Sequence, residues 1–269
     1  MDNLSQVPSV EQSVAGTSLG TEQVQAYLTR IRYDGPTDAS PETLRRLHRA
    51  HMLAVPFENL DISRGRKIVV DDALFVRKIV EERRGGFCYE LNGSFAALLR
   101  ALGFNLTLHS ARVPRADGSD GPEFDHLTLR VDLEEPWLAD VGFGDSFIEP
   151  LRLELGLEQD QDGRVYRIVG DGRTLRMQRL GSNGWKNQYL FSPRPRHLEE
   201  FAGMCHFHQT SPESHFTRKR ICSLATDDGR ITLSDLTLIV TRNGQRREET
   251  LGSEEVWRQA LERYFGLRL

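Results

Sequence analysis

The apolar residues of this chain change their spacing near residue 104, and this change limits the folds that the chain can adopt. Before that point they recur every three or four residues, as in Leu91, Phe95 and Leu98, which lie on one face of a helix. After it, apolar and polar residues alternate, as in FNLTLHSARV (104–113), which is typical of strands. The order predicts an α+β protein in which a helical part precedes an antiparallel sheet or small barrel.

Capping signals place the expected helices. Thr21 is the expected N-cap of the first helix. Ser40 is that of the second, with Pro41 at its first position and a stop before Pro56. A third helix is expected over Asp71 to Arg83 and a fourth from about Cys88 to Gly103. Residues 21 to about 103 are therefore expected to be mostly helical.

The last third of the chain mixes strands and helices. SPRPRHLEEFAGMCHFHQTSPESHF (192–216) is expected to be a loop with one short helix. Two hairpin-like segments follow, with turns at DDG and NG. A terminal helix is expected from its cap at Ser253 to Gly266, with Val256, Ala260 and Tyr264 on one apolar face.

Composition excludes several classes of protein. The net charge of −4 gives no general attraction to nucleic acid or to anionic membranes. No apolar run approaches the ~20 residues that cross a bilayer. Residues 1–20 are polar, lack the pattern of a secretory signal, and are expected to form a loose tail. Three cysteines without a CxxC pair favour free thiols in a reducing cytoplasm.

Cys88 is the cysteine with the strongest signal for chemistry. It follows Gly85 and Gly86, which allow a tight turn and a close approach to a ligand, and it begins the fourth predicted helix. The positive end of the helix dipole is expected to lower the thiol pKa from about 8.5 toward neutral. Backbone N–H groups there can also stabilise an oxyanion. The alternative is a buried structural cysteine.

A nucleophilic cysteine needs a base and a group that orients the base. His126 opens a predicted strand, and Asp140 follows fourteen residues later, after a turn and a second strand. Such a hairpin can bring the two side chains together, although a half-buried histidine and a strand-end aspartate are equally compatible with the spacing. His48 and His51 are expected on an exposed part of the second helix.

Five segments, in order over about 170 residues, resemble the arylamine N-acetyltransferase family. RGGFCYELN (84–92) is similar to its cysteine signature R-G-G-x-C-x-E-x-N, and VPFENLDI (55–62) to its V-P-F-E-N segment. The other three are DHLTLRV (125–131), WLADVGFG (137–144) and SPESHFTRKRICSLAT (211–226). The resemblance implies a catalytic triad of Cys88, His126 and Asp140.

The resemblance also implies a fold: a helical bundle, a β-barrel and an α/β lid around a cysteine-protease-like catalytic core. We expect the tail at 1–20, the helical domain with the nucleophile at 21–104, the barrel with His126 and Asp140 at 105–205, and the lid at 206–269.

The implied activity moves an acetyl group from acetyl-CoA to an aromatic amine or hydrazine by a ping-pong mechanism, as in xenobiotic metabolism. Acetyl-CoA is the implied cosubstrate, and no tightly bound cofactor is expected. Phe57 and Phe143 are candidate walls of the amine site. Candidate CoA contacts are Gly142, Gly144 and the basic residues Arg218 and Lys219.

Other interpretations stay open at this stage. A thiol hydrolase or an amide synthase would use the same triad on another acyl substrate, and a binding module would carry an inert Cys88. Cys205, His206 and His208 are of metal-ligating types but lack a fourth ligand with paired spacing, so no metal is expected. The partners expected are small molecules, not nucleic acid or membrane. Either a monomer or a homodimer fits the sequence.

Overall fold

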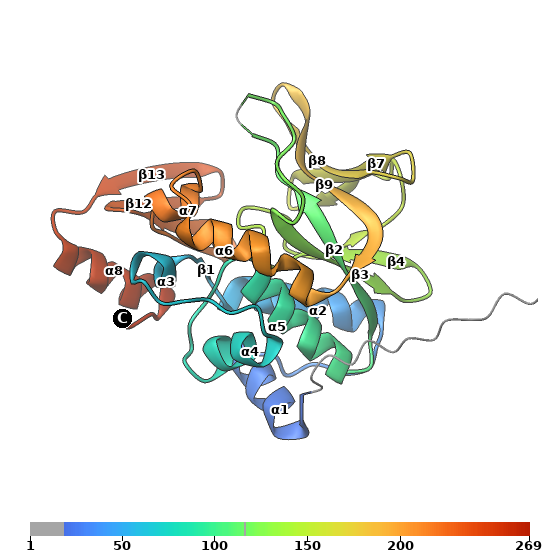
Figure 1. Ribbon diagram of the computed structural model, residues 1–269, viewed down its shortest axis with the longest axis horizontal. Coiled ribbons are helices and arrows are strands. Elements are labelled where there is room, and N and C mark those ends of the chain that lie inside the picture. Colours follow the sequence, from blue (N-terminus) through green and yellow to red (C-terminus); the bar gives the residue numbers. More distant parts are fainter. Residues whose placement is uncertain (1–18, 116) are drawn as a thin grey trace, which may run out of the picture.

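The structure is a computed structural model that describes residues 19–115 and 117–269 (Figure 1). Most of the tail predicted at 1–20 therefore lies outside the described residues. The helical part contains α1 (Thr21–Arg30), α2 (Pro41–Ala54), α3 (Leu60–Ser63), α4 (Asp72–Val80) and α5 (Cys88–Ala101), with the short strand β1 (Phe57–Glu58) between α2 and α3. Within the described residues, no helix combines the length and the apolar character needed to cross a membrane.

Local capping explains where these helices begin. Ser40 Oγ accepts a hydrogen bond from the Thr43 amide at 3.3 Å, and Asp71 Oδ1 accepts one from the Leu74 amide at 2.9 Å. The cap at Ser40 agrees with the sequence prediction, whereas Asp71, predicted as the first helical residue, is the N-cap of a helix that begins at Asp72. At α1 the prediction is wrong by one residue, because Gly20 is the N-cap and Thr21 is already helical. The third helix is shorter than predicted and ends at Val80.

An eight-stranded antiparallel sheet forms the barrel-like part. Its strands are β2 (Asn105–Arg112), β3 (His126–Asp132), β4 (Pro136–Ala139), β5 (Leu151–Arg152), β6 (Gln159–Gln161), β7 (Arg164–Gly170), β8 (Leu175–Gly181) and β9 (Gly184–Arg196), in the order β5-β4-β3-β2-β9-β8-β7-β6. The two edge strands meet through Gln159, whose side chain bonds the amide and the carbonyl of Arg152 at 2.8 and 3.0 Å. This side-chain link nearly closes the barrel, as the alternating pattern predicts.

The segment 192–216 is more ordered than predicted. β9 continues through Pro193 and Pro195 to Arg196. This end of the strand pairs with β2 but not with β8, so one of its edges is unpaired. Proline, which has no N–H to donate, is tolerated at such an edge. A short 3-10 helix (Leu198–Phe201), α6 (Ala202–Thr210) and α7 (His215–Arg218) follow. The expected loop with one short helix is therefore mostly helical.

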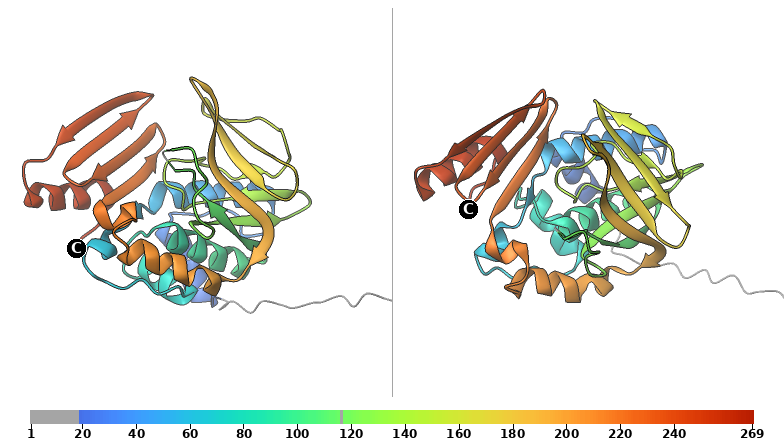
Figure 2. Two further views of the ribbon diagram at one scale, coloured as in Figure 1. Left: turned by 45° about the horizontal axis from the view of Figure 1, so that its top comes forward. Right: turned by 90° about the horizontal axis from the view of Figure 1, so that it is seen from above.

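A five-stranded antiparallel sheet forms the lid, and the helical part supplies one of its strands. The order is β1, then β10 (Ile221–Thr226), β11 (Gly229–Ser234), β12 (Thr237–Arg242) and β13 (Gln245–Thr250). Phe57 lies opposite Ser223 and Glu58 opposite Cys222. The views in Figure 2 show this sheet beside the barrel-like sheet.

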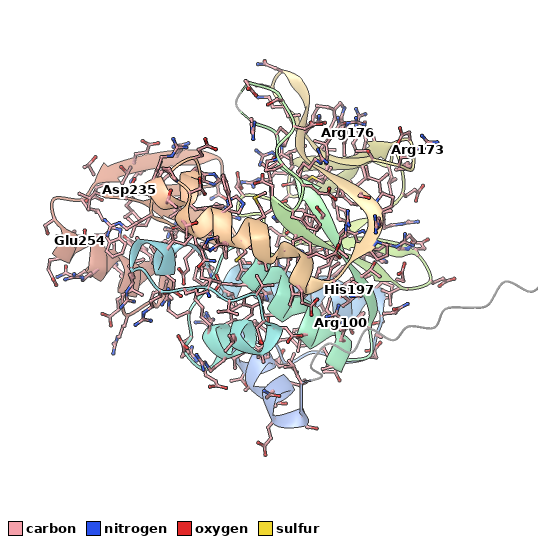
Figure 3. All side chains as sticks on the ribbon, in the orientation of Figure 1. Arg100, Arg173, Arg176, His197, Asp235 and Glu254 are labelled. Carbon is pink, nitrogen blue, oxygen red and sulfur yellow. The ribbon has the colours of Figure 1, made fainter. Side chains whose placement is uncertain are left out.

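The terminal helix α8 (Glu254–Phe265) packs on the lid sheet. Ser253 caps it and Gly266 ends it in a left-handed conformation, as predicted. The predicted apolar face is wrong at Val256, which is 40% exposed, because Trp257 and Leu261 point into the core instead. Arg220 ties the sheet to this helix: its amide donates to Asp235 and its guanidinium to Glu254, both labelled in Figure 3.

The described residues form three apolar clusters: the largest joins the helices to β2, β3 and β4, the second lies inside the lid, and the third lies inside the barrel-like sheet. The predicted boundaries near residues 104 and 205 stay predictions.

Candidate active site

Cys88 is the first residue of α5 and is only 3% exposed. The helix packs against β3, which begins with His126 (Figure 1). A methyl group added to Gly142 would lie 2.9 Å from the Cα atom of Cys88, so the loop after β4 contacts the start of α5 directly. Glycine at 142 therefore permits a close approach of this loop to the helix.

His126 and Asp140 are direct neighbours. The hairpin of β3 and β4 places Leu129 opposite Ala139, and His126 Nε2 lies 2.6 Å from Asp140 Oδ2. Both side chains are almost fully buried. This confirms the proximity expected from their spacing. Because Nε2 pairs with the carboxylate, Nδ1 is the imidazole nitrogen that can exchange a proton with a substrate or a sulfur atom.

Two residues besides His126 hold Asp140 in place. Asn92, one turn after Cys88 on α5, donates to Asp140 Oδ1 at 2.9 Å and to the Leu127 carbonyl at 2.6 Å. Its own oxygen accepts the Val141 amide at 2.9 Å. His48 Nε2 accepts the Asp140 amide at 3.1 Å. The helical part thus fixes the carboxylate that the barrel contributes.

His48 was expected on an exposed face, and that prediction is wrong. His48 and His51 are both fully buried. Because Nε2 of His48 accepts a hydrogen bond, its Nδ1 carries the proton and donates to the Ile148 carbonyl at 2.6 Å. Burial lowers the pKa of His48 to about 4, so the ring is neutral near pH 7. Histidine is treated as polar when a helical pattern is read from sequence. Such a pattern therefore does not predict a buried ring with both nitrogens hydrogen-bonded.

The electrostatics of Cys88 differ from the sequence expectation. Burial raises the pKa of the thiol well above its ordinary value, and the carboxylates of Asp125 and Asp140 act in the same direction. A backbone hydrogen bond at Leu127 lowers it only in part. At the helix start, the carboxylate of Glu90 accepts the Phe87 amide at 3.1 Å. Burial therefore opposes ionisation of this thiol, and a cation beside it would favour ionisation.

Gly85 and Gly86 also differ from expectation. A methyl group on Gly85 would lie 1.9 Å from the Pro56 carbonyl oxygen, and one on Gly86 would lie 2.6 Å from Cβ of Glu90. Both glycines thus allow close approach of protein atoms, where the sequence suggested approach of a ligand.

A buried ionic cluster lies beneath this turn. Arg84 donates twice to Glu58 Oε1, at 2.7 and 3.0 Å, and once to Asp61. Lys78 lies 2.8 Å from Asp61 and 2.7 Å from Glu90. Burial raises the pKa of Glu90 to about 7, although the positive charge of Lys78 acts to lower it. Since Glu90 caps α5, the cluster supports the turn that carries Cys88.

The two predicted aromatic residues have different neighbours. The Phe143 ring centre is 5.1 Å from that of His126 and 4.9 Å from that of Tyr189. Phe57 packs on Phe216 of α7, with ring centres 6.2 Å apart. Phe216 was not singled out from the sequence, although it lies inside the resembling segment 211–226. Both Phe57 and Phe143 are half-buried.

The candidate CoA contacts are scattered. The Gly142 amide donates to Asp140 Oδ1 at 3.0 Å, and Gly144 has a left-handed backbone with φ of 84°. Arg218 and Lys219 are exposed at the end of α7. Cavities of about 350 and 310 Å³ border other residues and not the triad. The structure thus brings Gly142 to Cys88 but gives no such link to Arg218 or Lys219 within the described residues.

Comparisons with known sequences agree on one family. Residues 40–269 match the family model described as N-acetyltransferase. The arylamine N-acetyltransferase / N-hydroxyarylamine O-acetyltransferase of Salmonella typhimurium is 33% identical over 251 residues, covering 92% of this chain and 89% of that protein. The arylamine N-acetyltransferase of Mycolicibacterium smegmatis is 36% identical over 253 residues, covering 90% of this chain and 91% of that protein.

Solved structures show the same similarity. The arylamine N-acetyltransferase from Salmonella typhimurium superposes with a TM-score of 0.86 at 33% identity, covering 92% of both chains. The Mycobacterium marinum arylamine N-acetyltransferase in complex with CoA gives a TM-score of 0.85 at 32% identity, covering 90% of this chain and 92% of that one.

Proposed function

The chain belongs to the arylamine N-acetyltransferase family, and we propose that it works through an acetyl thioester on Cys88, in a ping-pong reaction with His126 and Asp140. As a member, it is an acetyl-CoA-dependent acyltransferase. The observation that carries the proposal is the 2.6 Å contact of His126 with Asp140 beside the helix that begins at Cys88. We place this reaction in the cytoplasm, because the three cysteines are free.

The first half-reaction begins with a neutral thiol. Because burial raises the pKa of Cys88, ionisation requires transfer of its proton to Nδ1 of His126. Asp140 stabilises the imidazolium that results. Burial alone would raise the pKa of Asp140. The nearby His126 and the hydrogen bonds from Asn92 and Gly142 outweigh burial and hold this pKa below its ordinary value, so the carboxylate is charged.

The thiolate then attacks the carbonyl carbon of acetyl-CoA. The bond from that carbon to the CoA sulfur breaks, and the departing CoA thiolate takes the proton from His126. One thioester replaces another, so the acetyl group on Cys88 stays activated. Backbone N–H groups at the start of α5 and in the loop at Gly142 are the candidate donors to the oxyanion.

In the second half-reaction a neutral amine attacks the acetyl group on Cys88. His126 accepts the amine proton as the bond to the Cys88 sulfur breaks, and the amide leaves. Phe143, stacked edge-on against His126, and the pair Phe57 and Phe216 are the proposed walls for an aromatic ring. An aromatic amine or hydrazine is therefore the proposed acceptor.

A panel of acyl-CoA donors and amine acceptors, with free CoA as the readout, tests the function. Acetyl-CoA alone should release one equivalent of CoA per protein in a burst, and adding an aromatic amine should make the release continuous. Continuous release without any amine would instead identify a hydrolase. Labelling of Cys88 together with failure on every small aromatic amine would favour an amide synthase with a larger acceptor.

A further inference from the structure

His208 is a buried histidine that the proposed triad does not use. It lies on α6 and is 3% exposed. This helix passes close to the start of α5 (Figure 1), where the ring centre of Tyr89 is 6.2 Å from that of His208. Tyr89 directly follows Cys88 in the chain. His208 therefore lies near the proposed nucleophile, although the two residues are remote in sequence.

His208 contacts Asp125, the residue directly before His126. Its Nε2 atom lies 3.2 Å from Oδ1 of Asp125 and 3.3 Å from the carbonyl oxygen of the same residue. A carbonyl oxygen can only accept a hydrogen bond, so Nε2 carries a proton and is the donor. On the other side of the ring, Nδ1 lies 3.2 Å from Ser214 Oγ. Both ring nitrogens are thus engaged, which orients the ring toward Asp125.

The segment that His208 contacts has a strained backbone. Phe124 has a positive φ of 66°, which is uncommon for a residue with a bulky side chain. Its amide donates to Ser110 Oγ at 2.7 Å, and its carbonyl accepts the Tyr89 hydroxyl at 2.7 Å. Such a conformation costs about 1–3 kcal/mol and persists only where surrounding contacts hold it. Contacts from α5, β2 and α6 therefore fix the two residues before His126.

Asp125 also acts on Cys88 through its charge. Burial raises the pKa of the Cys88 thiol, and the carboxylate of Asp125 raises it further. A hydrogen-bond donor held against a carboxylate offsets part of its negative charge. Because Nε2 of His208 is such a donor, it weakens the effect of Asp125 on the thiol.

We propose that His208 is a positioning residue for the acetyl transfer. Through Asp125 it fixes the chain that leads into His126 and offsets a negative charge that opposes the thiolate of Cys88. The inference rests on the proposed function, because it takes Cys88 as the nucleophile. Removal of His208 and removal of the Asp125 charge should then change the reactivity of Cys88 in opposite directions. If the pair only supported the fold, both changes would lower that reactivity.

Alkylation of Cys88 by iodoacetamide near pH 7, followed by mass spectrometry, tests the proposal. His208→Phe removes the donor and should slow alkylation about threefold to tenfold, since a rise of one unit in the thiol pKa lowers the thiolate fraction tenfold. Asp125→Asn removes the charge but keeps the backbone carbonyl, and should speed alkylation by a similar factor. His208→Gln keeps an N–H donor and should restore most of the wild-type rate. His206→Phe, at an exposed position of the same helix, is the matched control and should react as the wild type does.

A double variant with Asp125→Asn and His208→Phe shows whether His208 acts through Asp125. Without the charge, His208→Phe should have little further effect on the rate. An unchanged rate in His208→Phe, slower alkylation in Asp125→Asn, or the same fold-change for His208→Phe in both backgrounds would overturn the proposal. If His208→Phe does not fold, the direction of the change in Asp125→Asn still decides.

Alkylation needs neither acetyl-CoA nor an amine, so the two proposals fail separately. Opposite changes in alkylation in a protein that transfers no acetyl group would refute the proposed function and leave the effect of His208 on Cys88 standing. In a protein that does transfer it, the burst of CoA should slow in His208→Phe by the same factor as alkylation. An unchanged burst would overturn the role of His208 in the reaction.

Discussion

Asn92 Nδ2 lies 2.9 Å from Asp140 Oδ1, although the two residues are 48 positions apart, one on the helix α5 and the other directly after the strand β4. The same amide group also bonds the carbonyl of Leu127, the residue after His126. The helix that presents the nucleophile therefore also orients the carboxylate and the strand that carries the base. One side chain couples all three positions of the proposed triad.

Replacing Asn92 should impair catalysis more than binding. Asn92→Ala removes a hydrogen bond to the charged Asp140, so we expect kcat to fall by about tenfold to a hundredfold with little change in the KM for acetyl-CoA. Steady-state kinetics measure this split. Ser94→Ala on the same helix, which loses a hydrogen bond with Tyr27, is the control and should keep its kcat. An unchanged kcat in Asn92→Ala would contradict a role in orienting Asp140.

Cys88 should be the only thiol that transfer requires. Cys88→Ala should abolish both the burst of CoA and the turnover, because no acetyl thioester can form. Cys205→Ala and Cys222→Ala should keep most of the activity, since these cysteines are buried elsewhere and burial raises both of their pKa values. Turnover by Cys88→Ala would rule out the proposed mechanism.

Asp140→Asn should leave the chain folded and make Cys88 less reactive. An amide at 140 cannot stabilise the imidazolium of His126, so less of the thiol ionises. We expect slower alkylation of Cys88 by iodoacetamide near pH 6 than in the wild type, while the far-UV circular dichroism spectrum stays the same. Equal alkylation rates in the two proteins would show that Asp140 does not act on the thiol.

His48 should make the protein sensitive to acid. Its pKa is about 4 in the folded chain and near 6.5 when unfolded, so the unfolded state binds a proton first as the pH falls. The free energy of unfolding should therefore decrease between about pH 6.5 and pH 4, by up to about 3 kcal/mol from this residue. Burial of His51 acts in the same direction.

Urea unfolding at several pH values measures this effect. His48→Gln keeps an acceptor near the Asp140 amide but cannot titrate, so its unfolding free energy should depend less steeply on pH in that window. A slope identical to that of the wild type would assign the acid sensitivity to other groups.

Arg84 should be essential for stability. Arg84→Met leaves Glu58 buried with Lys78 at 3.9 Å as its remaining cation, and breaking a buried pair costs about 3–5 kcal/mol. Chemical denaturation measures the loss. Arg83→Met, next in the chain and exposed, should be nearly neutral. A loss below about 1 kcal/mol in Arg84→Met would show that the ionic cluster relaxes around the missing charge.

Local patterns in the sequence predicted much of the fold. The caps at Ser40 and Ser253 and the turn at Asn243–Gly244 depend on neighbouring residues alone. Both residues of that turn have positive φ, as the NG pair predicts for a two-residue hairpin. The strand through Pro193 and Pro195 was missed, because whether a proline is tolerated depends on which neighbouring strand is present.

The proximity of His126 and Asp140 was compatible with the short hairpin that separates them, and the family resemblance implied it. The neutral state of His48 and the raised pKa of Cys88 were not predictable, since both follow from burial by segments remote in the sequence. The helix dipole alone predicted a more acidic thiol.

The pairing of β1 with β10 has a consequence for synthesis on the ribosome. Glu58 is made early, yet the strand that covers it contains Cys222, more than 160 residues later. Until β10 has been synthesised, the backbone edge of β1 is unpaired and the carboxylate of Glu58 is incompletely buried. A contact between residues so far apart in sequence forms late, and such non-local pairing slows the final step of folding.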